Sequence, residues 1–291
     1  MASPSCDRIG GVPATFGLST HLFHGSRLSP AHLALVARHG FTAVEIYATR
    51  SHVDYRDPAH VEEIGQALAD QGLRLHSVHA PTTTSFSGGV WGPTLSLAAA
   101  DESLRRGAVE ETLAAMGIAT QVPFRHLVVH VGAPETSPTL NQRAAARRSL
   151  ETLADAAEPL GIRLALEVIP NPLSQPGALV TFIEDVLERR SVGICLDTGH
   201  AHLWGDVSEA IELCSGHLLT THLHDNHGRR DEHLIPGRGT IDWDGALLAF
   251  QKVGYDGAWM FELGPTESPA DTLAAAAEAR RTLAQALEME Q

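Results

Sequence analysis

Short apolar runs alternate with longer amphipathic segments along the whole chain. The short runs are rich in β-branched residues and predict eight strands, at 16–20, 43–46, 73–79, 127–131, 164–168, 192–196, 219–223 and 258–263. The segments between and after them repeat apolar residues every three to four positions and predict eight helices, at 30–39, 58–71, 97–116, 140–160, 178–190, 207–214, 243–253 and 269–289. Cap residues agree with these bounds, because Ser29, Asp57 and Asp242 precede predicted helices and Gly72 and Gly161 follow them.

This alternation predicts the fold class. Strands that are apolar throughout are typical of parallel sheets covered on the outside by helices. Eight successive strand–helix units therefore indicate a (β/α)₈ TIM barrel, and the absence of a linker-like tract predicts one domain over residues 1–291. A doubly wound open sheet is the alternative, but the glycine-rich fingerprint expected after its first strand is missing.

Composition narrows the class of protein. Neither a signal segment nor a run of 18 apolar residues is evident, so we expect a cytoplasmic protein without a membrane partner. Cys6, Cys195 and Cys214 are odd in number and far apart, which predicts reduced thiols. The net charge of −14 weighs against nucleic acid without excluding it, since bound metal ions would neutralise part of the acid.

Metal-ligating residue types recur at the ends of the predicted strands. Active sites of TIM barrels are built where the strands end, so these side chains should meet there. A further stretch, residues 221–239, is dense in imidazole and carboxylate and adds donors from a loop. The candidate ligands are His79, His130, Glu167, Asp197, His200, His222, Asp231, His233 and Glu262.

Charge explains why this set points to metal. Four carboxylates in one barrel mouth would repel one another, and some would have to protonate or move apart. Two divalent ions would neutralise them, and a third would leave the site positive enough to hold a phosphate. Neutral imidazoles would complete the coordination. We therefore expect one to three divalent ions per chain, Zn²⁺ or Mn²⁺, with open positions for substrate.

The motifs CLDTGH, HLHDN and DEHLIPGRGTIDW carry a resemblance to a known family. The chain resembles the xylose-isomerase-like barrel superfamily, which includes sugar phosphate isomerases, epimerases and the endonuclease IV group. In ketose 3-epimerases one metal is held by residues that correspond to Glu167, Asp197, His222 and Glu262. In endonuclease IV three zinc ions share nine ligands, and all nine ligand types are present here.

The resemblance implies a reaction. A metal ion would chelate adjacent oxygens of an open-chain sugar, sugar phosphate or sugar acid and stabilise an enediolate. Glu167 and Glu262 would move the proton between opposite faces of the carbon. His200, His224 and Arg229 or Arg230 are the candidate substrate-binding residues, although no arginine matches the epimerase position cleanly. His224 could instead support neighbouring ligands.

Two alternatives remain open. One is a zinc phosphodiesterase acting on abasic DNA, against which the opening FGLSTHLFHG and the isomerase-like wording of the loop both weigh. The other is a metal-dependent lyase or dehydratase, or a barrel that binds without turnover. The sequence leaves the substrate and a possible homo-oligomer open.

Several other residues have simpler interpretations. We expect a salt bridge to an arginine or a substrate contact for Glu45, and a loop anchor in Asp225. Backbone N–H groups at 237–239 could bind phosphate. Positions on the surface or rim are expected for His21, His24, His202 and His227.

Overall fold

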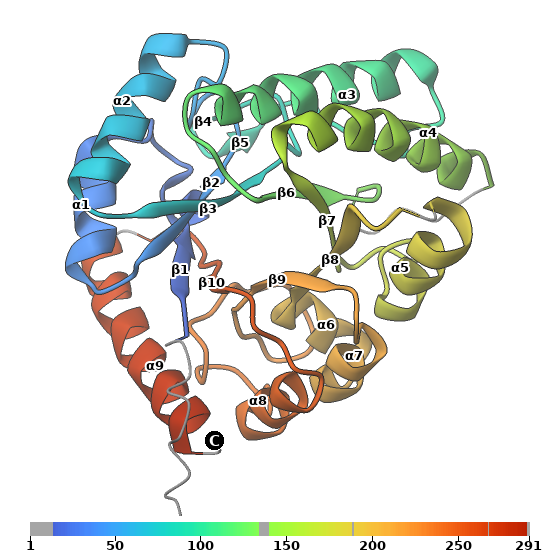
Figure 1. The fold of residues 1–291 in the computed structure, drawn as a ribbon. Coiled ribbons are helices and arrows are strands. Elements are labelled where there is room, and N and C mark those ends of the chain that lie inside the picture. The colour runs from blue at the N-terminus through green and yellow to red at the C-terminus, as the bar shows by residue number, and fades with distance from the viewer. Residues whose placement is uncertain (1–13, 134–139, 188, 267, 290–291) are drawn as a thin grey trace, which may run out of the picture.

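Eight parallel strands form the centre of the molecule, and the helices surround them (Figure 1). The computed structural model describes residues 14–133, 140–187, 189–266 and 268–289. The barrel strands are β1 (Phe16–Ser19), β2 (Ala43–Tyr47), β3 (Arg74–His79), β6 (His126–His130), β7 (Arg163–Glu167), β8 (Val192–Asp197), β9 (Leu218–His222) and β10 (Trp259–Phe261).

The sheet closes on itself. The strands follow the order β10-β1-β2-β3-β6-β7-β8-β9, with parallel pairing throughout. Just beyond the end of β9, Leu223 donates its N–H to the carbonyl of Met260 at 2.7 Å and accepts from the N–H of Glu262 at 3.2 Å. These bonds join the two outermost strands, so the structure confirms the predicted single-domain TIM barrel.

The helices pack around the outside of the strands. They are α1 (Pro30–Arg38), α2 (Pro58–Asp70), α3 (Glu102–Met116), α4 (Leu140–Ala157), α5 (Pro176–Phe182), α6 (Thr198–Trp204), α7 (Val207–Leu213), α8 (Trp243–Lys252) and α9 (Pro269–Met289). Short 3₁₀ turns at Thr20–Phe23, Gly117–Thr120 and Glu158–Leu160 and a π-helical turn at Ile183–Leu187 complete the helical set. The red α9 lies beside the blue α1 and closes the barrel's outer ring (Figure 1). Within the described ranges no helix is long and apolar enough to cross a membrane.

Three segments differ from the sequence-based prediction. The third helix starts at Glu102, later than expected, because the Asp101 side chain accepts from the N–H groups of Ser103 and Leu104 and caps it there. The loop predicted after β3 contains a hairpin, β4 (Phe86–Ser87) and β5 (Val90–Trp91). Helix α6 was not expected; its N-cap is Asp197, whose side chain accepts from the N–H of His200.

Candidate metal centre

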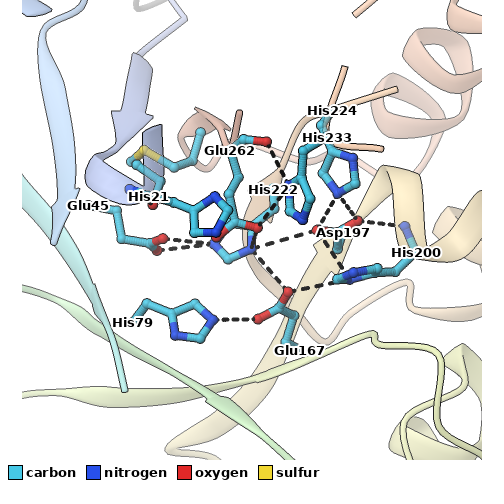
Figure 2. Close-up of polar contacts among 12 residues, drawn as sticks. His21, Glu45, His79, Glu167, Asp197, His200, His222, His224, His233 and Glu262 are labelled. Carbon is cyan, nitrogen blue, oxygen red and sulfur yellow. Dashed lines mark hydrogen bonds and ion pairs between the residues drawn. The ribbon is translucent and has the colours of Figure 1, made fainter. Parts of the chain in front are cut away.

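Strand register brings the predicted ligands together at the carboxyl end of the barrel. His130 pairs with Glu167 across β6 and β7, and Asp197 pairs with His222 across β8 and β9. Neighbouring strands lie about 5 Å apart, so residues in register at strand ends meet directly. Figure 2 shows the side chains of Glu167, Asp197, His222 and Glu262 pointing toward a common centre from different strands.

The most deeply buried group contains Glu167, Asp197, His222 and Glu262, each with one donor atom within 4.8 Å of the others. Nδ1 of His222 lies 3.3 Å from Oε1 of Glu167 and 3.4 Å from Oε2 of Glu262. None of the four residues exposes more than 3% of its surface. Three carboxylates around one imidazole nitrogen form a donor set suited to a divalent cation.

Glu45 holds the opposite nitrogen of His222. Nε2 of His222 lies 3.0 and 3.1 Å from the two oxygens of Glu45, and Ser77 donates its hydroxyl to Oε2 at 2.7 Å. The prediction of a salt bridge between Glu45 and an arginine was wrong. Closing the barrel places this fully buried carboxylate against His222 instead. A carboxylate behind a metal-binding histidine orients the ring and makes it a stronger ligand.

A second group shares Glu167 with the first. Nε2 of His79 and Nε2 of His130 each lie 3.0 Å from Oε2 of Glu167, and the three residues form a candidate ligand group. Oε1 of Glu167 faces His222, so the two oxygens of one carboxylate point into two adjacent groups. Glu167 is thereby placed where it could bridge two ions.

The third group consists of His200, His224, Asp231 and His233. Nε2 of His200 lies 3.1 Å and Nε2 of His233 lies 3.0 Å from Oδ2 of Asp231. His233 has a φ of 45°, a left-handed backbone that non-glycine residues rarely adopt. Such strain gathers at sites where geometry serves function.

His224 takes the supporting position that the sequence left open and also joins a ligand group. Its Nε2 lies 2.9 Å from Oδ1 of Asp197, and its ring stacks on His233 with centroids 4.1 Å apart. It therefore supports Asp197 and stands within the third ligand group. Its contact with substrate stays a prediction.

Hydrogen bonding tests whether these residues fit a metal. In each of four histidines one ring nitrogen faces a backbone carbonyl or carboxylate, which can only accept, so that nitrogen carries the hydrogen. The other nitrogen then turns a lone pair toward a carboxylate that also only accepts. A cation, either a metal ion or a proton, must therefore lie between this nitrogen and the carboxylate oxygen. This arrangement fits metal ligation. The fixed pairs are His79 with Ala80, His200 with Val168, His233 with Glu262, and His222 with Glu45.

Electrostatics agree with this fit. Burial lowers the pKa of His79, but the hydrogen bond and charge of Glu167 overcome it and raise the pKa to about 9. Burial also lowers the pKa of His233, but the hydrogen bond and charge of Asp231 overcome this effect and raise the pKa to about 9. Burial raises the pKa of Glu167, yet the neighbouring His130 and His222 hold it well below its usual value. Glu167 thus stays ionised, and its charge attracts a cation.

The two candidate arginines lie apart from this cluster. Arg229 and Arg230 are exposed in the loop after β9, and Arg230 is 3.4 Å from Glu232. Their contact with substrate remains a prediction. The loop anchor is confirmed, because Asp225 is buried and accepts from the N–H groups of Gly237 and Ile241. The N–H of Gly237 is therefore already bonded, contrary to the expectation that it could bind phosphate.

An aromatic wall beside the centre was missed by sequence analysis. The ring of His21 lies 5.0 Å from that of His233, and the ring of Tyr47 lies 5.1 Å from that of His79. His24 is buried, contrary to the rim position expected for it, and stacks on Trp91 of the hairpin at 4.7 Å. Glu45 could have been found, since it falls at an apolar strand end as the other acids do, whereas the hairpin contacts had no sequence signal.

The comparisons with known proteins agree with this architecture. Uncharacterized protein MJ1311 of Methanocaldococcus jannaschii is 30% identical over 260 residues, which cover 85% of this chain and 83% of that protein. D-psicose 3-epimerase of Agrobacterium fabrum is 25% identical over 241 residues, covering 79% of this chain and 78% of the enzyme. The crystal structure of a D-tagatose 3-epimerase-like protein matches with a TM-score of 0.76 and 26% identity, over 94% of this chain and 97% of that one. Residues 33–286 match the model of one family, and the chain belongs to it: the xylose isomerase-like TIM barrel family.

Proposed function

We propose that this protein is a divalent-metal-dependent isomerase or epimerase of a small sugar, sugar phosphate or sugar acid. The proposal is supported by relatives named as sugar 3-epimerases. The observation that carries it is the pair Glu167 and Glu262, which enter one buried group from β7 and from the end of β10, with β8 and β9 between them. Two carboxylates that approach one centre from different strands suit removal and return of a proton.

A divalent ion held by Glu167, Asp197, His222 and Glu262 would supply Lewis-acid stabilisation of the negative charge on the substrate oxygen. Glu167 removes the proton from the carbon next to the carbonyl, and Glu262, protonated at the start of the step, gives its proton to the opposite face. The step leaves Glu167 protonated and Glu262 ionised, and proton exchange with solvent resets the pair. The lowered pKa of Glu167, which burial opposes but His130 and His222 produce, keeps it ionised and ready to accept. Burial of both carboxylates excludes water and strengthens these interactions.

This role constrains the second ligand group. Glu167 can act as a base through Oε2 only if no metal ion occupies that oxygen, and Oε2 is the atom that faces His79 and His130. With metal at His79 and His130, Glu167 would bridge two ions and its lone pairs would be used. In the proposed reaction these histidines therefore orient Glu167 by hydrogen bonding.

A second candidate, phosphodiester hydrolysis at abasic DNA, is favoured by one observation. All nine predicted ligands fall into three candidate groups, two of which share Glu167. Three ions so arranged would stabilise both the attacking and the leaving oxygen of a phosphate. The two functions make opposite demands on Glu167, so the number of bound ions separates them.

Metal content and proton exchange test the proposal together. We expect about one tightly bound ion per chain. We also expect the metal-supplied protein to exchange the α-proton of D-psicose with deuterated solvent, and NMR measures this exchange. Glu167→Gln should slow this exchange about 10²- to 10⁴-fold, the usual contribution of a positioned general base. Glu63→Gln, on the exposed face of α2, changes the charge equally and should exchange as the unaltered protein does.

Two results would overturn the assignment. Exchange that persists in Glu167→Gln would remove Glu167 from the reaction. Three bound zinc ions together with nicking of abasic DNA, and no exchange with any sugar tried, would establish the second candidate instead.

A further inference from the structure

A pocket of about 320 Å³ lies at the opposite end of the barrel from the candidate metal centre. Its lining residues come from positions where strands begin, including Arg74 of β3, His126 of β6 and Arg163 of β7. The metal ligands stand where the same strands end. The pocket is therefore a separate site, and its volume is at the lower end of the range for small-molecule sites.

The charge of this pocket is opposite to that of the whole chain. Three guanidinium groups, from Arg74, Arg125 and Arg163, line it, and Asp256 is the carboxylate among its lining residues. Among the residues that the structure describes, Arg74 and Arg125 make no side-chain hydrogen bond or ion pair, and Arg163 donates to the carbonyl of Arg190 at 3.2 Å. The local balance is about +2 in a chain whose formal charge is −14. Three guanidinium groups beside a single carboxylate favour an anion.

Two buried imidazoles point to the same conclusion independently. His76 and His126 line the pocket, expose 4% and 9% of their surface, and have ring centroids 4.9 Å apart. Nδ1 of each is buried without a hydrogen-bond partner in the described part of the chain. Buried polar atoms normally have partners, so two unpaired nitrogens in adjacent rings of one pocket leave hydrogen-bonding capacity for a polar ligand or a bound water.

Neutral rings suit that ligand. Burial lowers the pKa of His76 to about 4, with Arg74 and Arg125 adding to the effect. Burial, the neighbouring His76 and Arg163 lower the pKa of His126 to about 3. Each neutral imidazole keeps one N–H to donate, while the arginines supply the positive charge.

We propose that this pocket binds a small dianion through its phosphate group, either inorganic phosphate or a phosphate monoester. The net charge of about +2 matches a dianion, and planar guanidinium groups recognise phosphate oxygens in pairs. The site is independent of the metal-dependent reaction proposed above, because it shares no residue with the ligand groups.

The test is titration of the full chain with inorganic phosphate and, separately, with glycerol phosphate, by calorimetry. Arg74→Gln combined with Arg125→Gln should weaken binding about tenfold or more for each charge-assisted hydrogen bond that is removed. Arg38→Gln combined with Arg143→Gln changes two exposed arginines elsewhere and should bind as the unaltered chain does. Tighter binding of the monoester would identify an organic phosphate as the ligand, and equal or tighter binding of phosphate would identify the free ion.

Repeating each titration with and without a chelator separates the two ends of the barrel. Binding at the pocket should persist when metal is removed, and the arginine variants should retain their metal affinity. Three results would each overturn the proposal. They are phosphate binding that occurs only when metal is present, phosphate binding to Arg74→Gln/Arg125→Gln that is as tight as to the unaltered chain, and no phosphate binding to the unaltered chain at all.

Discussion

Replacing Glu45 by glutamine tests how the centre is organised, because Glu45 contacts Nε2 of His222, the ring nitrogen that faces away from the other ligands of its group. The carboxylate is fully buried, and both of its oxygens lie within 3.1 Å of Nε2 of His222. Glutamine has nearly the same shape, and its carbonyl oxygen can still accept from Ser77, so the fold should persist. Its amide group, however, can donate to Nε2.

The magnitude follows from the position of the histidine proton. If glutamine donates to Nε2, the ring hydrogen moves to Nδ1, which faces Glu167 at 3.3 Å and Glu262 at 3.4 Å. Nδ1 can then no longer offer a lone pair to metal unless this hydrogen bond is broken. Loss of such a supporting partner typically weakens metal binding about 10- to 100-fold, or about 1.4–2.7 kcal/mol.

The assay is competition for Zn²⁺ against a chromophoric chelator, with Glu63→Gln as the control of equal charge change. Thermal unfolding of metal-free protein checks that each variant is folded. Equal zinc affinity in Glu45→Gln and Glu63→Gln would refute the reasoning, since it would mean that Glu45 does not orient the ring.

Three further outcomes are expected. Chelating the metal should lower the melting temperature, because an ion present at about 100 times its Kd adds about 2.7 kcal/mol of stability; an unchanged melting temperature would contradict metal binding. Gly239→Ala should lower the free energy of unfolding in urea by about 1–3 kcal/mol, since its Cβ would overlap Oδ1 of Asp225 and the backbone carbonyl of Asn226; Gly107→Ala, with open space inside α3, is the control and should not destabilise. His52 is buried, which lowers its pKa to about 4 although a carbonyl hydrogen bond opposes the shift. The unfolded chain therefore binds the extra proton between pH 6.5 and 4, and the native state loses stability as pH falls through this window. His52→Gln should reduce the loss between about pH 7 and 4.5 by about 2 kcal/mol in urea unfolding, and an identical pH dependence would contradict this.

Local patterns explain why most of the fold was predictable. Asp57 and Asp242 cap helices where expected, because an N-cap acts on N–H groups two or three residues away. Helix α6 was missed because it is short and its cap, Asp197, stands out in the sequence as a metal ligand. The start of α3 was misplaced because residues 97–100 have the same helix-forming composition as the helix itself, whereas the N-cap that begins it is Asp101.

The candidate site was predictable in residue type and less so in partners. Glu167, Asp197 and Glu262 stood out because an unpaired carboxylate at a buried strand end is costly. The partner of Glu45 could not be predicted, because His222 is 177 residues away and becomes a neighbour only when the barrel closes. The contact of His224 with Asp197 likewise depended on the pairing of β8 with β9, which brings together residues 27 positions apart.

By itself the sequence determined the period of each element, its caps and the kinds of donor at the strand ends, because these depend on residues close together in the chain. Only the tertiary structure decided which nitrogen of each histidine faces a carboxylate, how Glu167 joins two ligand groups, and that arginines at strand starts gather around a pocket. Those relations exist between residues far apart in sequence, and the register and closure of the barrel create them.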